Sequence, residues 1–341
     1  MSIVKVGING FGRIGKMILR LSLLRSDVKI VGINDPFIDV NQMAYLLKYD
    51  SVHGKFDGSI EVCDGDLVVN GNKISVFSQR YPSNIDWKSC GAKYIAETSG
   101  IFTANEDVKL HIKYGGARKV IVTSAGENLP VFIPGINLDK YEKKYKAVSM
   151  ASSEMNCLAP LIKVLDENFG IEEAISTTID SATSITSAVD ATNKFDLRKN
   201  RGILGNIIPT KNSINREIES VFPDFKGRII SKAIFVPTSD VGLLDLNVKL
   251  KTDTSIDEVR YKVKEASETY MKSVLGYTED DVVSSDIISD KRCCIFDAKA
   301  SVALNGSFMK LFAWFDNEVA YSDKVLDLIV YMNSLDRRIN K

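Results

Sequence analysis

Three glycines near the amino terminus have the spacing of a phosphate-binding turn. Gly10, Gly12 and Gly15 follow the apolar run 3–8. Glycine at such positions allows a tight turn and lets the backbone approach a pyrophosphate, which then lies at the N-terminus of the following helix. Asp35 stands about 20 residues further on, where an acid accepts hydrogen bonds from ribose hydroxyls and repels a 2′-phosphate. The pattern predicts dinucleotide binding and favours NAD over NADP, the alternative being a glycine turn without a ligand.

The residues around this turn have the pattern of a strand–helix–strand unit. Ile14, Met17, Ile18 and Leu21 recur at helical spacing, and the run 28–33 is typical of a buried strand. Further β-rich runs occupy 67–69, 93–96 and 119–123. We therefore predict an α/β fold in which residues 1–151 form a doubly wound Rossmann domain for a nucleotide.

The second half of the chain has a different pattern. A helical apolar face follows Ser153 and comprises Cys157, Leu158, Leu161, Ile162 and Leu165. Strand-like runs lie at 174–179, 233–236, 243–250 and 308–315, and the segment 187–206 is long and polar. This mixture predicts an α+β second domain. Near the end, Ser322 has the residue type of an N-cap before a helical face that comprises Val325, Leu328, Ile329 and Met332.

Composition narrows the class of protein. The 341 residues include 44 basic and 44 acidic side chains, so we expect neither nucleic acid nor a membrane as partner. Residues 1–20 lack the apolar core of a signal peptide, and no apolar run reaches transmembrane length. Five cysteines, an odd number, predict free thiols in a reducing, cytoplasmic compartment. Adjacent Cys293 and Cys294 suggest redox or metal chemistry, but packed thiols are the commoner case, and we expect no metal site.

Several motifs occur in the order found in one enzyme family. They are GINGFGRIG at 7–15, YDSVHG at 49–54, ETSGIFT at 97–103, ASSEMNCLAP at 151–160 and WFDNE at 314–318. Together they resemble the glyceraldehyde-3-phosphate dehydrogenase family over essentially the whole chain. The resemblance implies a Rossmann domain at 1–151, a catalytic-type domain with a mixed sheet at 152–317, and a C-terminal helix at 318–341 that packs back on the Rossmann domain. It also implies NAD, a homotetramer and a place in glycolysis.

The resemblance also assigns residues to the cofactor. Arg13 and Ile14 match the phosphate loop, Asp35 the ribose contact, and Asn317 the asparagine that holds the nicotinamide carboxamide. Ser99 and Thr123 each replace one hydroxyl residue of the family by the other. The full set expected to bind NAD is Gly10, Gly12, Arg13, Ile14, Asp35, Arg80, Ser99, Thr123 and Asn317.

The chemical residues of the family are changed here. Ser153 stands where the family's ASCTTNCLAP segment has its nucleophilic cysteine, whose thiolate forms beside a helix N-terminus and a histidine. Asp180 stands where the family's TTVHA segment has that histidine. A serine hydroxyl ionises far less readily than a thiol, and an ordinary carboxylate with a pKa of about 3.9 is a weak base. We expect no functional catalytic residue at either position.

The family's phosphate-binding positions are changed as well. Phe235 replaces the arginine of AFRVPT, so an apolar ring stands where a guanidinium would fork onto phosphate. Glu154 and Met155 replace two threonines, and the carboxylate opposes an anionic substrate beside it. Ile185 replaces a further threonine. The positions matched to substrate phosphate are Ser152, Thr183, Phe235, Asn212 and Ser213.

Other reactive side chains are expected to be structural. Cys157 matches the family's second, packed cysteine. His53 and His111 are the only histidines, the first in a turn and the second on a predicted surface helix. Arg198 and Arg201 match a loop near the family's subunit interface.

Three functions remain open from the sequence. The first is an NAD-binding pseudoenzyme of this family that has lost phosphorylating oxidation. The second is an NAD-dependent dehydrogenase with an altered substrate or mechanism, in which Glu154 and Asp180 transfer protons without a covalent intermediate. The third is a structural or regulatory subunit, in a hetero-oligomer with an active paralogue.

Overall fold

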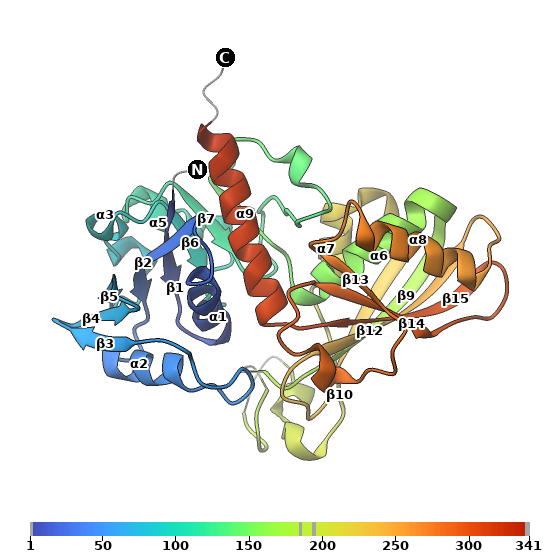
Figure 1. The fold of residues 1–341 in the computed structure, drawn as a ribbon, viewed down its shortest axis with the longest axis horizontal. Helices are drawn as coiled ribbons and strands as arrows, with labels where there is room; N and C mark the ends of the chain where they lie inside the picture. Colours follow the sequence, from blue (N-terminus) through green and yellow to red (C-terminus); the bar gives the residue numbers. More distant parts are fainter. Residues whose placement is uncertain (1–2, 184–185, 193–195, 338–341) are drawn as a thin grey trace. The chain divides into compact units, whose positions relative to one another are not determined.

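The computed structural model describes residues 3–183, 186–192 and 196–337. The chain divides into two compact units (Figure 1). Unit 1 comprises Met1–Ala151 and Tyr321–Lys341, and unit 2 comprises Ser152–Ala320. No helix in the described ranges combines the length and the apolar character needed to cross a bilayer.

Unit 1 contains one eight-stranded sheet in the order β3-β4-β5-β2-β1-β6-β7-β8. Its strands are β1 (Val4–Asn9), β2 (Val28–Asn34), β3 (Ile60–Cys63), β4 (Asp66–Val69), β5 (Asn72–Phe77), β6 (Tyr94–Glu97), β7 (Lys119–Val122) and β8 (Ala147–Ser149). The run β5-β2-β1-β6-β7-β8 is parallel, in the strand order of the doubly wound dinucleotide-binding fold. The predicted runs 93–96 and 119–123 lie in β6 and β7, parallel strands that are buried throughout, and the run 67–69 lies in the antiparallel strand β4, where burial alternates.

The helices of unit 1 are short, apart from α1, α2 and the C-terminal helix α9. They are α1 (Arg13–Ser22), α2 (Val40–Lys48), α3 (Trp87–Cys90), α4 (Asn105–Val108), α5 (Leu110–Lys113) and α9 (Val319–Arg337), with 3-10 turns η1 (Pro82–Asn84) and η2 (Leu138–Lys140). The predicted face of α1 is buried at Met17, Ile18 and Leu21. A capping box between Asp39 and Gln42 fixes the start of α2.

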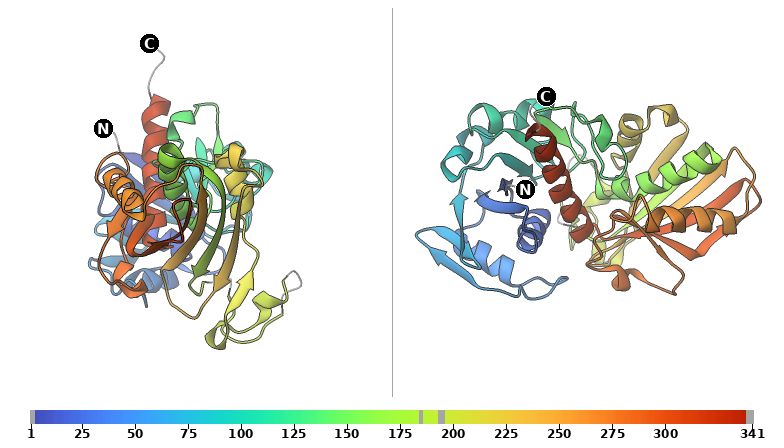
Figure 2. Two further views of the ribbon diagram at one scale, coloured as in Figure 1. Left: turned by 90° about the vertical axis from the view of Figure 1, so that its right-hand side faces the viewer. Right: turned by 45° about the horizontal axis from the view of Figure 1, so that its top comes forward.

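Helix α9 begins earlier than the sequence indicated. Ser322 was predicted to be its N-cap, but the helix starts at Val319, and Ser322 is fully buried inside it. Asp316 precedes the helix, and its Oδ1 accepts hydrogen bonds from the backbone N of Glu318 and of Val319 at 2.8 and 2.7 Å. An aspartate outside the apolar pattern therefore sets the start of the dark red helix in the right-hand view of Figure 2.

Unit 2 contains one seven-stranded mixed sheet in the order β10-β11-β9-β12-β15-β14-β13. Its strands are β9 (Ile171–Asp180), β10 (Ile208–Thr210), β11 (Ile229–Phe235), β12 (Gly242–Leu250), β13 (Leu275–Thr278), β14 (Cys294–Ala303) and β15 (Phe308–Phe315). Its helices are α6 (Ser153–Phe169), α7 (Ile214–Val221) and α8 (Ile256–Glu268), with 3-10 turns η3 (Arg198–Asn200), η4 (Ile203–Gly205), η5 (Pro223–Phe225) and η6 (Ser284–Ile287).

One face of this sheet is covered by helices. Burial alternates residue by residue along β12, and α6 packs on β9, β12, β14 and β15 (Figure 1). Alternation of this kind is typical of a strand with one face on the core. Strands β9 and β11 are parallel, and their last residues, Asp180 and Phe235, are register partners. The sheet therefore brings these two positions side by side at the carboxyl ends of neighbouring strands.

Candidate functional site

The glycine turn of unit 1 has the backbone that a dinucleotide requires. Gly10 has φ of +94°, and a Cβ at this position would lie 2.8 Å from backbone atoms of Ser99. A Cβ on Gly15 would overlap the carbonyl oxygen of Gly10. Both positions therefore exclude any side chain, and the turn keeps β1 and α1 in close contact.

The N-terminus of α1 is open to an anion. Its N-cap, Gly12, offers no side chain, and the first turn of α1 contains no acidic residue. The N–H groups of that turn therefore have no carboxylate from α1 itself to bind, which suits a pyrophosphate. Asp35 accepts hydrogen bonds from the backbone N of Phe11 and of Phe37, each at 2.9 Å. Each of its oxygens can accept a second bond, so ribose hydroxyls fit there.

The other residues assigned to the cofactor have the following contacts. Arg13 Nη1 lies 2.7 Å from Asp50 Oδ2, and Arg80 lies over the ring of Phe37. The hydroxyl groups of Ser99 and Thr123 bind different oxygens of Glu97: Ser99 Oγ donates to the carboxylate at 2.6 Å, and Thr123 Oγ1 to the backbone carbonyl at 3.0 Å. Asn317 belongs to unit 2, where its Oδ1 accepts from Ser181 Oγ at 3.2 Å.

Glu97 is a buried residue whose role the sequence did not indicate. Its Oε1 accepts from both the backbone N and the Oγ of Ser99, and its Oε2 from Asn9 Nδ2 at 2.5 Å. His111 Nε2 lies 3.0 Å from the same Oε2, and Trp87 Nε1 donates to His111 Nδ1 at 2.9 Å. Because an indole N–H only donates, Nδ1 must accept, and His111 holds its proton on Nε2 toward Glu97.

The prediction that His111 lies on a surface helix is therefore wrong. Its side chain is fully buried, because the short helix α5 turns it inward against Trp87.

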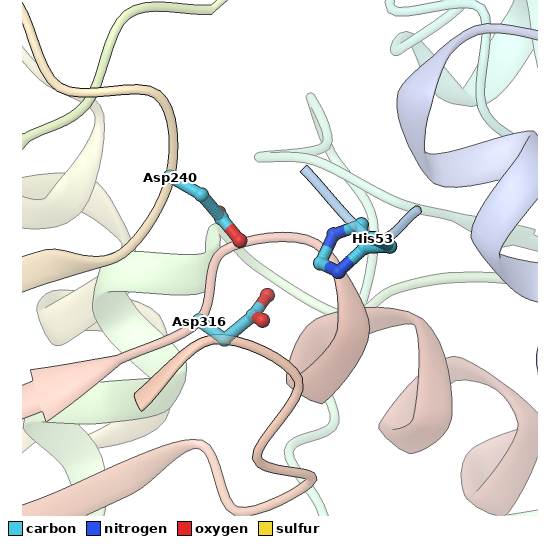
Figure 3. A group of neighbouring side chains, drawn as sticks. All are labelled: His53, Asp240 and Asp316. Atoms are coloured by element: carbon cyan, nitrogen blue, oxygen red, sulfur yellow. The ribbon is translucent and has the colours of Figure 1, made fainter. Parts of the chain in front are cut away.

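His53, the other histidine, lies in a turn of unit 1, where its backbone N donates to Asp50 Oδ1 at 3.0 Å. Figure 3 draws His53 together with Asp240 and Asp316, two residues of unit 2.

The N-terminus of α6 carries Ser153, the position that the resemblance matches to the family's nucleophile. Ser152 is the N-cap, and its Oγ accepts from the backbone N of Met155 at 3.2 Å. Ser153 is the first residue of the helix, as predicted, and its Oγ donates to Glu154 Oε2 at 3.2 Å. Its hydroxyl therefore lies at the positive end of the helix dipole with a carboxylate beside it.

Asp180 differs from the ordinary carboxylate assumed from the sequence. It lies at the end of β9 with 6% of its surface exposed, and its Oδ2 accepts from Thr178 Oγ1 at 3.0 Å. Its Oδ1 has no hydrogen-bond partner in the described part of the chain. Burial, together with the negative charge of Glu154, raises the pKa of Asp180 to about 8. This carboxyl group is therefore largely protonated at neutral pH.

Glu217 is the residue of the site that sequence reasoning missed. Its Oε2 accepts from Ser152 Oγ at 2.6 Å and from the backbone N of Ser152 at 3.2 Å, and its Oε1 accepts from Ser213 Oγ at 2.7 Å. Two of the hydroxyls assigned to substrate phosphate thus donate to a carboxylate of the chain itself. A signal was present, because Glu217 lies on the buried face of α7 between Ile214 and Ile218, where a charged residue is unusual.

The remaining phosphate positions lie in mixed surroundings. Phe235 is buried and packs against Ile203 and Ile208. Asn212 Nδ2 donates to Ser231 Oγ at 3.3 Å, whereas Thr183 Oγ1 is buried without a hydrogen-bond partner among the described residues. Ile185 lies outside the described residues.

The cysteines of unit 2 are packed thiols, as expected. Cys157, Cys293 and Cys294 are buried, and none of the three forms a disulfide bond. Burial raises the pKa of the Cys157 thiol, and its hydrogen bond with Cys294 adds to this effect. A thiol in this state is a poor nucleophile. In the loop region, Arg201 forms an exposed ion pair with Asp190, with 3.1 Å between Nε and Oδ1.

Comparison with known proteins identifies the family. Residues 4–105 match the family model of the glyceraldehyde 3-phosphate dehydrogenase NAD binding domain, and residues 152–317 match that of the C-terminal domain. Glyceraldehyde-3-phosphate dehydrogenase 1 of Mucor circinelloides f. lusitanicus is 46% identical, over 98% of this chain and 99% of its own length.

Two further relatives agree. Glyceraldehyde-3-phosphate dehydrogenase 2 of Schizosaccharomyces pombe is 46% identical, over 98% of this chain and 100% of its own length. The cytosolic glyceraldehyde-3-phosphate dehydrogenase of Gracilaria gracilis is 44% identical, with the same two shares. The match to the NAD binding domain gives NAD as the cofactor of the first domain. The chain belongs to the glyceraldehyde-3-phosphate dehydrogenase family.

Proposed function

We propose that this chain is an NAD-binding member of the family that does not carry out the phosphorylating oxidation of glyceraldehyde 3-phosphate. The observation that carries the proposal is the set of side chains at the N-terminus of α6 in unit 2. There Ser153 takes the nucleophile position, and Glu217 binds two hydroxyls assigned to phosphate.

The proposal follows from the acid–base properties of these groups. A serine hydroxyl needs a base to become a nucleophile. Asp180, at the position of the base, has a pKa of about 8 and so holds a proton at neutral pH. Ser153 donates to Glu154, whose negative charge disfavours an alkoxide beside it. Neither the nucleophile nor the base of the family's reaction is then present in active form.

Unit 1 supports retention of the cofactor. The open N-terminus of α1, the backbone of Gly10 and the carboxylate of Asp35 fit a dinucleotide without change. We further propose a cytoplasmic homotetramer, in line with the family. The relatives are named as dehydrogenases. The proposed loss of phosphorylating oxidation rests on Ser153, Asp180 and Glu217 of this chain.

An assay of the purified protein tests this proposal. With NAD, glyceraldehyde 3-phosphate and phosphate, we expect NADH formation at least about a thousandfold below that of an active relative, since loss of a catalytic nucleophile costs at least this much. NAD should still raise the melting temperature by mass action. Turnover near that of the relative, above contaminating host enzyme, would refute the proposal.

A second candidate, a dehydrogenase with an altered substrate, has one specific observation in its favour. Asp180 Oδ1 is buried without a partner, and its carboxyl group has a pKa of about 8, close to that of a working general base. Its carboxylate form could take the proton of a substrate hydroxyl while NAD accepts the hydride. A screen of hydroxy and aldehyde compounds with NAD or NADH tests this, and no turnover with any would exclude it.

A further inference from the structure

The carboxylate of Glu217 accepts hydrogen bonds in the way that a bound anion does. It is 3% exposed, and three donors converge on it: the backbone N and the Oγ of Ser152, and the Oγ of Ser213. Ser152 is also the N-cap of the 17-residue helix α6, so these donors lie at the positive end of a long helix dipole. This is the arrangement of an occupied oxyanion site whose occupant is part of the chain.

The neighbouring groups do not favour a second anion. Glu154 lies in the first turn of α6, and its charge raises the pKa of both Asp180 and Glu217, in each case after the larger effect of burial. Asp180 Oδ1 is buried and has no partner in the described chain, and its carboxyl group is largely protonated at neutral pH, so Glu154 and Glu217 are the negative charges that face an incoming anion. An incoming phosphate would meet like charge and find its donors already bonded.

Because Glu217 is part of the chain, it excludes a free anion more strongly than a dissolved carboxylate would. Glu217 lies one helical turn after Ser213 on α7, so its carboxylate is always near the donors. An attached group competes at an effective concentration of about millimolar or more. A free anion must displace it and also leave Glu217 buried without its hydrogen bonds, which is costly.

We propose that Glu217 is a specificity-determining residue, an internal oxyanion that closes the N-terminus of α6 to phosphate and sulfate. This end of unit 2 then accepts neutral groups in place of phosphorylated ones. The inference rests on the proposed function, because it gives the reason why phosphate does not enter the site. Its test measures anion binding and requires no turnover.

The test is a titration of the full-length protein with inorganic phosphate, and separately with sulfate, by calorimetry and thermal shift. The proteins are wild type, Glu217→Ala and Glu217→Gln, with Glu219→Ala as matched control. Glu219 is exposed on the same helix and pairs with Lys226 at 3.0 Å, so its loss removes one negative charge without touching the three donors.

We expect no saturable phosphate binding in the wild type or in Glu219→Ala. Glu217→Ala frees the donors and should bind phosphate at least about tenfold more tightly than the wild type, since one regained hydrogen bond to a charged group accounts for such a factor. Glu217→Gln retains the shape but not the charge, and should lie between the two. Where the alanine variant does not fold, the glutamine variant and the wild type decide the question.

Two results would overturn the inference. One is saturable phosphate binding by the wild type as tight as in Glu217→Ala. The other is a folded Glu217→Ala or Glu217→Gln protein that still binds NAD and gains no more phosphate affinity than Glu219→Ala. Turnover by a wild type that excludes phosphate would refute the proposed function alone, whereas a folded variant without anion binding would refute this inference alone.

Discussion

The carboxyl group of Asp180 has little contact with solvent, and Thr178 donates its one hydrogen bond from a described residue. Its pKa is about 8 in the folded protein, against about 3.9 in an unfolded chain. An acid with a raised pKa contributes stability while it remains protonated, and that contribution is lost as the pH rises through the folded value. The stability of the protein should therefore fall between about pH 4 and pH 8 because of this residue.

The variant Asp180→Asn tests this effect. An amide cannot ionise, so the free energy of unfolding of the variant should depend less on pH over this window than that of the wild type. At pH 8 the variant should be the more stable of the two, as urea unfolding at several pH values can measure. Asp253→Asn, at an exposed position of unit 2, serves as control. Equal pH dependence in wild type and Asp180→Asn would contradict the raised pKa.

The sequence alone predicted some features of the site residues and missed others. The sequence correctly placed Ser153 at the start of α6, because a cap and a helical apolar face are local signals. It missed the raised pKa of Asp180 and the contact of Glu217 with Ser152, because both depend on which strands and helices become neighbours. It also misplaced His111, since the partners that bury it, Trp87 and Glu97, come from other elements.

At the scale of elements, the strands were the easiest part to predict and the helix ends the hardest. Runs such as 308–315 coincide with strand β15, because its aromatic residues suit a pleated, half-buried surface. Ser322 was wrong as the N-cap of α9, because the side chain that binds the first N–H groups there, Asp316, precedes the apolar pattern of the helix. Caps depend on one side chain, whereas a strand or helix face depends on several.

Two N-cap serines of unit 2 allow a matched comparison. Ser152 caps α6 and also donates to Glu217, whereas Ser255 caps α8 by accepting from the backbone N of Glu258 at 3.1 Å. Ser255→Ala should cost about 1 kcal/mol of unfolding free energy, the usual value of a cap. Ser152→Ala should cost at least about 1 kcal/mol more, because a buried carboxylate loses a donor. Equal costs in denaturant unfolding would show that Ser152 acts only as a cap.

At the scale of the whole molecule, the two units differ in how far they fit the family's chemistry. Unit 1 keeps the glycine turn, the open helix and the acid that suit NAD. Unit 2 contains the mixed sheet and α6, and we propose that its chemistry departs from that of the family at Ser153, Glu154, Asp180 and Phe235, with Glu217 bound to Ser152 at the N-terminus of α6. The fold is independent of these positions, which explains why family and fold are clear from sequence similarity while the activity is not.

This joint change is the central claim, and restoring the thiol alone tests it most directly. NADH formation from glyceraldehyde 3-phosphate and phosphate is measured for Ser153→Cys beside the wild type and an active relative. We predict a rate that stays at the background of the wild type, because Asp180 still replaces the base and Glu217 still closes the anion site. A rate for Ser153→Cys within about tenfold of the active relative, a difference of only about 1.4 kcal/mol in barrier, would contradict the account.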